Sequence, residues 1–327
     1  MLIGKPPDIP SSAITPKDQY LNRRRFLRGA VSGAVTLGAA ALGADRLAEV
    51  FSPRIRALAG TKLETIKSPL TTTGEELTSY MAVTTYNNFY EFGVDKGAPS
   101  KNAGGLPTRP WIIQVDGKVK NPKTFDIEAL LKLRPLEDRV YRHRCVEAWS
   151  MVIPWIGYSL SEFIKQCEPL STAKFVQFRS YYDRNVEKWS LDEAIYWPYS
   201  EGLRMDEAMN PLALLTFGLY GEVLPNQNGA PVRIVVPWKY GFKSAKSIVG
   251  VRFLDKMPST TWNDLNPGEY GFYSNVNPNV DNPRYSQKTE RRIGQPFYAQ
   301  TRSTLMFNGY GDQVASLYTG MDLRKFY

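Results

Sequence analysis

Residues 227–246 read QNGAPVRIVVPWKYGFKSAK and combine a predicted β-strand with a turn rich in cations. The run VRIVV at 232–236 is apolar apart from Arg233, which is typical of a buried strand. Cationic side chains and backbone amides converging on the turn that follows would suit a phosphate group. The polar side chains of this turn are Lys239, Lys243, Ser244, Lys246 and Ser247. The spacing is not that of a Walker loop or a dinucleotide fingerprint, and a solvated basic face remains an alternative.

Further strands are predicted on both sides of this stretch, and long loops after it. The predicted strands lie at 111–115, where an Asp-Gly turn follows, at 174–178 and at 247–253. Residues 263–295 are rich in Asn, Pro, Gly and Tyr, which indicates long ordered loops. With 23 prolines and 25 glycines in 327 residues, this pattern favours an α+β fold with mixed sheets over a helix bundle.

The predicted helices are short. Residues 130–133 belong to a helix that Pro135 stops, and a second helix is expected to run from 159 to Cys167, before Pro169. Helix starts of the capping-box type are expected at Ser159 with Glu162 and at Ser190 with Glu193.

The net charge of +9 is distributed unevenly along the chain. Residues 1–59 hold nine Lys/Arg against four Asp/Glu and so account for +5 of it. The remainder has no long run of Lys or Arg and no nucleic-acid motif, so no nucleic-acid partner is expected.

The supply of metal-binding side chains is small. The chain has one histidine, His143, and two cysteines, Cys145 and Cys167. These counts exclude a bis-His haem, a His-rich zinc site, a multi-copper site and a four-cysteine iron–sulfur cluster within this chain. Any metal must therefore need few ligands from the protein.

The first sixty residues resemble a twin-arginine export signal. Residues 22–28 read NRRRFLR, and a weakly apolar run of Ala, Gly, Val and Leu follows at 29–44. We predict a signal peptide at 1–59, with cleavage near Ala44 as an alternative, and a single mature domain at 60–327. A retained basic anchor is the other interpretation. Twin-arginine export carries folded proteins, usually because a cofactor is inserted in the cytoplasm, so a bound redox cofactor and a periplasmic location are expected.

Residues 141–150, YRHRCVEAWS, place three basic side chains before Cys145. Neighbouring cations lower the pKa of a thiol, and a thiolate is a soft metal ligand. The residues alone leave two other interpretations, a disulfide with Cys167 and an unreactive buried cysteine. His143 would share a face with Cys145 on a strand but not on a helix.

Residues 86–92, YNNFYEF, interleave amides, phenols and a carboxylate with aromatic rings. Such a segment can hydrogen-bond a flat heterocycle, and an ordinary loop at the edge of the core is the alternative.

Taken together, residues 86–92, 144–150 and 227–246 resemble the sulfite-oxidase-fold molybdopterin enzymes, and within them the catalytic subunits of bacterial periplasmic protein-methionine-sulfoxide reductases. The resemblance covers essentially the whole mature chain. It implies a sulfite-oxidase-like fold, with Cys145 as the ligand of a molybdenum–molybdopterin cofactor, which excludes a disulfide to Cys167. The residues it implies for cofactor binding are Asn87, Tyr90, Glu91, Ser180, Asn228, Arg233, Ser244, Ala245 and Lys246. Ser180 stands where the family often has threonine, whereas His143 and Cys167 match no family motif.

The function implied by the resemblance is the reduction of methionine sulfoxide residues in oxidised periplasmic proteins, a repair reaction. Because the chain has one histidine, the electrons must come from outside it, and the resemblance implies a membrane-embedded haem-b partner serving a monomeric catalytic subunit. Glu147 and Asn88 are predicted to be catalytic, supplying protons or orienting the sulfoxide.

Two other functions remain as alternatives. A sulfite-oxidising enzyme on the same fold would be expected to cluster arginines around a dianion and commonly carries a haem or dimerisation domain, and neither extra domain is seen in the sequence. A non-catalytic exported binding protein would have no need of folded export.

Overall fold

The computed structural model describes residues 61–71, 74–187 and 195–326. The chain divides into two units, Met1–Pro53 and Arg54–Tyr327, and the described residues all belong to the second. The predicted signal peptide at 1–59 and the predicted capping box of Ser190 and Glu193 lie outside the described residues.

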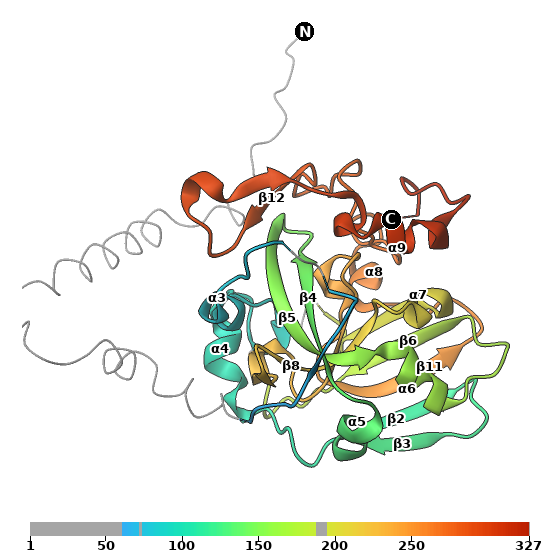
Figure 1. The fold of residues 1–327 in the computed structure, drawn as a ribbon. Helices are drawn as coiled ribbons and strands as arrows, with labels where there is room; N and C mark the ends of the chain where they lie inside the picture. The colour runs from blue at the N-terminus through green and yellow to red at the C-terminus, as the bar shows by residue number, and fades with distance from the viewer. Residues whose placement is uncertain (1–60, 72–73, 188–194, 327) are drawn as a thin grey trace, which may run out of the picture. The chain divides into compact units, whose positions relative to one another are not determined.

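The larger sheet is built around a long antiparallel hairpin of β4 and β5. On the edge opposite β4, β5 pairs in parallel with β12 at its start and in antiparallel with β8 at its end. Figure 1 shows this hairpin in the centre of the view, between α3 and α4 on one side and the second sheet on the other. The strands of the larger sheet are β1 Ile66–Lys67, β4 Glu137–Arg144, β5 Trp149–Ser159, β8 Leu214–Leu219, β9 Glu222–Val223, β10 Arg233–Val235, β12 Thr289–Arg292 and β13 Thr301–Ser303.

The second sheet has the order β3-β2-β11-β6-β7 and is mixed, because β11 pairs with β2 in parallel and with β6 in antiparallel. Its central strand β11 reads IVGVRFL, and β-branched residues of this kind pack well on a pleated surface. The strands are β2 Ile112–Gly117, β3 Lys123–Asp126, β6 Phe175–Ser180, β7 Ser200–Arg204 and β11 Ile248–Leu254. The strands predicted at 111–115, 174–178, 232–236 and 247–253 are thus present as β2, β6, β10 and β11.

The helices of the described residues are short. They are α3 Tyr80–Thr85, α4 Ala98–Asn102, α5 Ile127–Leu133, α6 Leu160–Cys167, α7 Met205–Met209, α8 Thr261–Leu265 and α9 Gly311–Val314. Single 3₁₀ turns add η2 Tyr90–Phe92, η3 Ala103–Gly105, η4 Asn226–Asn228, η5 Gly241–Lys243, η6 Phe297–Ala299, η7 Met306–Gly309 and η8 Ala315–Tyr318.

The helix predicted from 159 to 167 is present as α6, but its predicted capping box is wrong. Ser159 is the N-cap residue, yet its side chain makes no cap hydrogen bond. Its hydroxyl instead donates to the carbonyl of Pro211 (2.8 Å) and accepts from the buried Arg139 (2.9 Å). A buried guanidinium requires acceptors, and here that tertiary requirement overrides the local capping bond.

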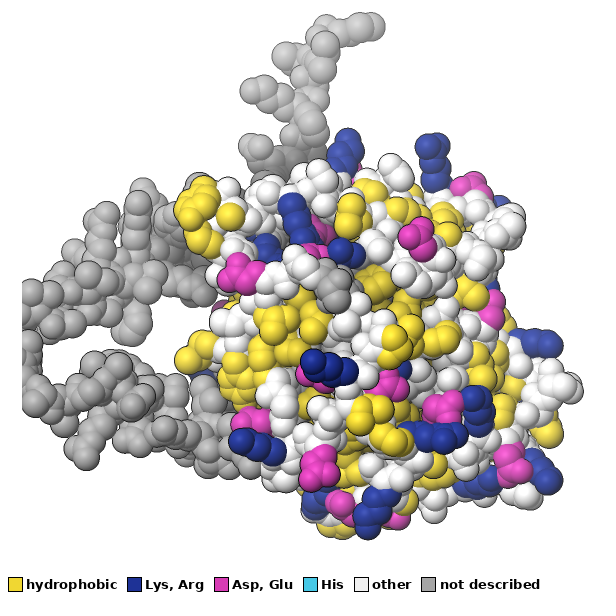
Figure 2. Space-filling view, viewed as in Figure 1, with side chains coloured by type: hydrophobic (Ala, Val, Ile, Leu, Met, Phe, Trp, Pro, Cys, Tyr) yellow, Lys and Arg dark blue, Asp and Glu magenta, His cyan; other side chains and the backbone are white. Residues whose placement is uncertain are grey.

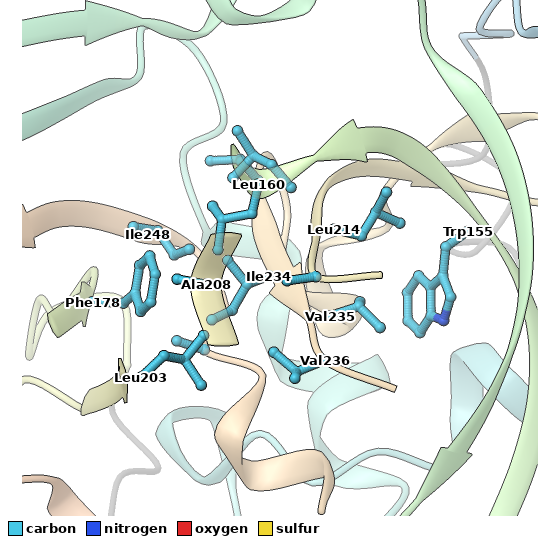
Figure 3. Packing of buried hydrophobic residues seen from close by; sticks show 14 of the residues in the cluster. Trp155, Leu160, Phe178, Leu203, Ala208, Leu214, Ile234, Val235, Val236 and Ile248 are labelled. Atoms are coloured by element: carbon cyan, nitrogen blue, oxygen red, sulfur yellow. The ribbon is translucent and has the colours of Figure 1, made fainter. Parts of the chain in front are cut away.

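One continuous hydrophobic core joins the two sheets. Figure 3 shows side chains of β10 (Ile234, Val235) packed among residues of α6, β6, β7 and β8, with Trp155 of β5 at the edge of the cluster. β10 leads by the loop 236–247 into β11 of the second sheet, so residues of this loop lie beside both sheets.

Short helices and mixed sheets confirm the predicted α+β class. Within the described residues, no helix has the length and apolarity that crossing a membrane requires. On the face shown in Figure 2, positive and negative side chains are interspersed over the surface.

Candidate active site

Cys145 lies in the tight turn that connects β4 to β5. Its backbone N–H donates to the carbonyl of Trp149 (2.9 Å), and its carbonyl accepts from Ala148 (3.1 Å), whose φ is 60°. The preceding residue, Arg144, is fully buried, donates to the Cys145 carbonyl and pairs with Glu290 of β12 at 3.0 Å. These contacts fix the backbone of the turn that carries Cys145.

A polar network surrounds the thiol. The amide of Asn88 donates to the Glu147 carboxylate (3.0 Å) and lies 3.5 Å from Sγ of Cys145. Glu147 also accepts hydrogen bonds from Lys96 (2.8 Å) and from the indole of Trp149 (2.9 Å). The two residues predicted to be catalytic, Asn88 and Glu147, therefore contact each other and the thiol.

The three basic residues before Cys145 do not act as predicted. Arg142 and Arg144 point away from the cavity, toward Glu75 and Glu290, because alternate residues of a strand face opposite sides. Burial raises the pKa of the Cys145 thiol to about 12, Glu147 adds to this, and nearby cations only partly oppose it. The prediction that the protein's own cations lower this pKa is thus wrong.

A cavity of about 330 Å³ opens above Cys145. All the predicted site residues line it except Ser244 and Ala245. Its wall consists of Val83, Tyr86, Asn87, Asn88, Phe89, Tyr90, Glu91, His143, Cys145, Val146, Glu147, Trp149, Met151, Ile153, Trp155, Ser180, Ile195, Trp197, Tyr199, Asn228, Arg233, Gly241, Phe242, Lys246, Trp262, Leu265, Tyr270, Arg284 and Tyr285. A volume of this size with an apolar wall and a few polar groups is typical of a small-molecule site.

Five side chains of this wall hold buried polar atoms without a hydrogen-bond partner in the protein. They are the carbonyl oxygens of Asn87 and Asn228, the hydroxyl of Ser180 and the indole N–H groups of Trp155 and Trp197. The amide nitrogens of both asparagines are fixed on the carbonyl of Val83, at 2.9 and 3.0 Å, so their orientation is set. Burying such groups is costly unless a ligand satisfies them. These residues therefore fit a polar heterocyclic cofactor.

Three cations line the cavity, and one of them, Arg284, is exposed. Arg233 donates to the carbonyls of Asn228 (2.9 Å) and Ser244 (3.3 Å), and burial lowers its pKa to about 9. Lys246 donates to the carbonyl of Asn88 (2.8 Å), and burial lowers its pKa as well. Burial raises the pKa of the neighbouring Glu91, and Lys246 opposes that rise. The cavity can therefore bind an anionic group at this end.

The prediction that Lys239 and Lys243 join this phosphate cradle is wrong. Lys239 pairs with the buried Glu207 at 2.6 Å, and Lys243 pairs with the buried Glu201 at 2.5 Å. A buried lysine requires a carboxylate partner, and residues of α7 and β7 supply it away from the cavity wall. Of the three lysines in this stretch, Lys246 is the one that lines the cavity.

Ser244 and Ala245 are buried behind the wall and shape it through the backbone. The Ser244 hydroxyl accepts from the N–H of Val236 (3.1 Å), and the Ala245 carbonyl accepts from Ile234 (3.0 Å). They fix the path of the loop that carries Lys246, and their predicted direct contact with a cofactor stays a prediction.

His143 also lines the cavity, although it matches no family motif. Strand β4 ends at Arg144, and His143 and Cys145 share the face that lines the cavity, as alternation along a strand predicts. Burial, reinforced by Arg233 and Lys246, lowers the pKa of His143 to about 3, so its imidazole is neutral. The aromatic residues Trp155, Tyr199 and Tyr285 were missed as well, because nothing in their local sequence distinguishes them from core residues.

Cys167 lies in α6, fully buried, with its thiol 3.3 Å from the carbonyl of Phe163. Both cysteines are free, so the disulfide interpretation is wrong. Within the part of the chain described, no group of three or more His, Cys, Asp or Glu side chains could hold a metal ion.

The comparisons agree with this chemistry. The family model of the oxidoreductase molybdopterin binding domain matches residues 103–262, which include Cys145, Ser180, Asn228, Arg233 and Lys246. The fold and the site thus define a molybdopterin-binding oxidoreductase.

Within that class, the chain belongs to the family of protein-methionine-sulfoxide reductase catalytic subunits. It is 58% identical over 323 residues to the catalytic subunit MsrP of Burkholderia mallei, covering 98% of this chain and 96% of that protein. It is 57% identical over 328 residues to MsrP of Ralstonia nicotianae, again covering 98% and 96%. Among solved structures, the sulfane dehydrogenase SoxCD from Paracoccus pantotrophus aligns with a TM-score of 0.41 and 16% identity, over 77% of this chain and 60% of that chain.

Proposed function

We propose that this protein reduces methionine sulfoxide residues in proteins with a molybdenum–molybdopterin cofactor bound through Cys145. The observation that carries the proposal is the cavity itself, in which a free thiol lies beside buried polar atoms that lack protein partners. The family supports methionine sulfoxide as the substrate. The two relatives are named as protein-methionine-sulfoxide reductases, and the chain aligns with nearly their full length.

The cofactor-binding residues surround the cavity on several sides. Asn87, Ser180 and Asn228 offer oxygen atoms that a pterin can hydrogen-bond, and Arg233 and Lys246 provide the positive charge for its phosphate. Tyr90 and Glu91 of the 3₁₀ turn η2 are also members of the predicted set and line the cavity. When bound, the cofactor supplies the two-electron chemistry that removes oxygen from a sulfoxide.

Glu147 and Asn88 are assigned to the substrate. Lys96 and Trp149 hold the Glu147 carboxylate beside the thiol, and Asn88 spans the two groups. We assign Glu147 the supply of protons to the departing oxygen and Asn88 the orientation of the sulfoxide. A Glu147→Gln variant that kept full turnover across the pH range would contradict the proton-supply role.

Residues 1–59 are proposed to direct export of the folded protein to the periplasm by the twin-arginine route. The relatives are named as catalytic subunits, which implies a partner subunit. We propose a membrane-embedded haem-b protein as that electron donor, serving a monomeric catalytic subunit whose substrates are oxidised periplasmic proteins.

The test compares wild type with Cys145→Ser, both produced with an intact cofactor pathway. Wild type should contain about one molybdenum per chain and reduce methionine sulfoxide with a chemical electron donor, whereas the variant should lose turnover. Wild type that oxidises sulfite but leaves methionine sulfoxide unchanged would overturn the substrate assignment. Wild type that contains no molybdenum would overturn the assignment of the cofactor as well.

A further inference from the structure

Exposed side chains mark the entrance to the cavity. Most residues of the cavity wall are buried or half-buried, but Leu265, Arg284 and Tyr285 are exposed. Leu265 retains 40% and Tyr285 37% of its accessible surface. Exposed members of a cavity wall lie where the cavity meets solvent, so a substrate that approaches Cys145 from solvent meets these side chains.

Tyr285 is held in a fixed position relative to the cysteine turn. The backbone groups of Tyr285 and Asn282 exchange two hydrogen bonds, at 3.1 and 3.2 Å. The side-chain amide of Gln287, 1% exposed, donates to the carbonyls of both Tyr285 (3.0 Å) and Val146 (2.7 Å). Val146 directly follows Cys145, so a single buried amide ties the entrance to the turn that carries the thiol.

Glu269 joins the Leu265 side of the entrance to the Tyr285 side. Its buried carboxylate accepts from the amide of Asn266 (2.9 Å), the residue after Leu265. The same carboxylate pairs with the guanidinium of Arg284 at 3.0 Å, next to Tyr285. Glu269 thus connects the backbone segments on both sides of the entrance. The exposed side chains of Leu265 and Tyr285 extend from these connected segments.

We propose that Tyr285 and Leu265 bind the polypeptide flanking the methionine sulfoxide residue, and thereby make the site prefer protein-bound over free methionine sulfoxide. This inference rests on the proposed function. Aromatic and aliphatic side chains on a rigid backbone provide contact area at a small entropy cost on binding. A peptide places neighbouring residues and neutral amides at the entrance, whereas the free amino acid places an ammonium and a carboxylate there, next to apolar side chains.

The experiment measures kcat and KM of the molybdenum-loaded enzyme with a reduced dye as electron donor. The two substrates are a short peptide with one methionine sulfoxide between apolar residues, and free methionine sulfoxide. Tyr285→Ala should raise KM for the peptide by about tenfold, as expected when a well-placed aromatic contact is lost. The KM for the free amino acid should change less than about twofold. For each substrate, the kcat of the variant should equal that of wild type. Leu265→Ala should act in the same direction.

The matched control is Tyr298→Ala, since Tyr298 is 89% exposed and is not part of the cavity wall. It should leave both KM values as in wild type. Molybdenum content and the unfolding midpoint of each variant identify any loss of folding, and Tyr285→Phe, which retains the ring, should keep the peptide preference.

Equal changes for peptide and free amino acid, or no change for either, would overturn the inference while leaving the reductase activity in place. A molybdenum-loaded wild type that reduces neither substrate would instead overturn the proposed function. The two failures are therefore distinguishable in one data set.

Discussion

Gly241 lies against the imidazole of His143 in the wall of the cavity. A β-carbon at position 241 would come within 2.7 Å of both Cε1 and Nε2 of that ring. Trp149 and Trp155 lie near the same ring, with centroids at 5.9 and 6.4 Å. The ring is confined between aromatic neighbours, so it has little room to move away.

Gly241→Ala should therefore destabilise the protein by about 1–3 kcal/mol, as overpacking a close-packed site does, and lower its molybdenum content. Unfolding in urea and metal analysis measure the two effects. Gly104→Ala is the control, because a β-carbon there meets no atom within 4 Å. If the Gly241→Ala protein were as stable as the control variant, the His143 ring would be able to move away from the added methyl group.

Ser180 and Ser150 form a natural comparison, since each has a buried hydroxyl without a hydrogen-bond partner, but of the two Ser180 alone lines the cavity. Ser180→Ala should lower cofactor retention, because one of the oxygen atoms available to the pterin is removed. Ser150→Ala should leave cofactor content as in wild type. Neither change removes a protein hydrogen bond, so the stability of the cofactor-free protein should shift by less than about 1 kcal/mol. Equal cofactor loss in both variants would argue against a contact from Ser180.

At the scale of elements, Glu75 connects three strands through arginines. It pairs with Arg142 of β4, with Arg292 of β12 at 3.1 Å and with Arg302 of β13 at 2.6 Å. Burial raises the pKa of Glu75, but the hydrogen bonds from Arg302 and Arg142 outweigh it, and the pKa falls to about 2. The ionised carboxylate is thus the form that the folded protein favours.

A carboxyl whose pKa is lower in the folded than in the unfolded state stabilises the fold above its unfolded pKa, and that stability is lost as pH falls. Glu75→Gln should therefore cost about 2 kcal/mol at pH 7, and the difference from wild type should shrink between pH 4.5 and pH 2. Unfolding free energies measured across this range provide the check. A difference that stays constant with pH would contradict the lowered pKa.

The strands that were predicted are those with local apolar character, such as β10 and β11. The central strands β4 and β5 were not predicted, although they carry Cys145 between them. β4 reads EDRVYRHR, and two of its arginines, Arg142 and Arg144, become suitable for a sheet because Glu75 and Glu290 pair with them in the fold. Such partners are distant in sequence, and no local pattern indicates them.

The residues of the candidate site likewise depend on partners that are distant in sequence. Residues 86–92, Cys145 and Lys246 stand out by their chemistry within short segments, and the family resemblance assigned them to a cofactor site. Lys239 carries equivalent chemistry and is nevertheless a structural residue, since the position of Glu207 decides its partner. Sequence identifies which residues can bind, and tertiary packing decides which of them line the cavity.

At the scale of the whole molecule, the cavity is a source of instability until it is filled. It holds about 330 Å³ of space and leaves buried oxygen atoms of Asn87, Ser180 and Asn228 without partners. A ligand that binds only the folded state stabilises it in proportion to the logarithm of its excess over Kd. The loaded and the cofactor-free protein should therefore differ in stability.

Protein purified from cells without the cofactor pathway should melt at a lower temperature than loaded protein. A ligand at a thousandfold excess over its Kd stabilises the folded state by about 4 kcal/mol. Scanning calorimetry of the two preparations measures the difference, and cofactor-free protein supplied with molybdate alone should remain at the lower temperature. Identical melting temperatures would mean that the cofactor does not fill the cavity.

The pairing of Arg144 with Glu290 also constrains the order of events during synthesis. These side chains are 146 residues apart, and the buried hydrogen bond between Glu207 and Tyr318 spans 111 residues. A nascent chain cannot form either contact until the later residue has left the ribosome. The turn that carries the thiol is braced only at that point, so cofactor loading has to follow translation of nearly all of residues 61–318. Ribosome-bound chains arrested before residue 290 are expected to be unable to take up the cofactor.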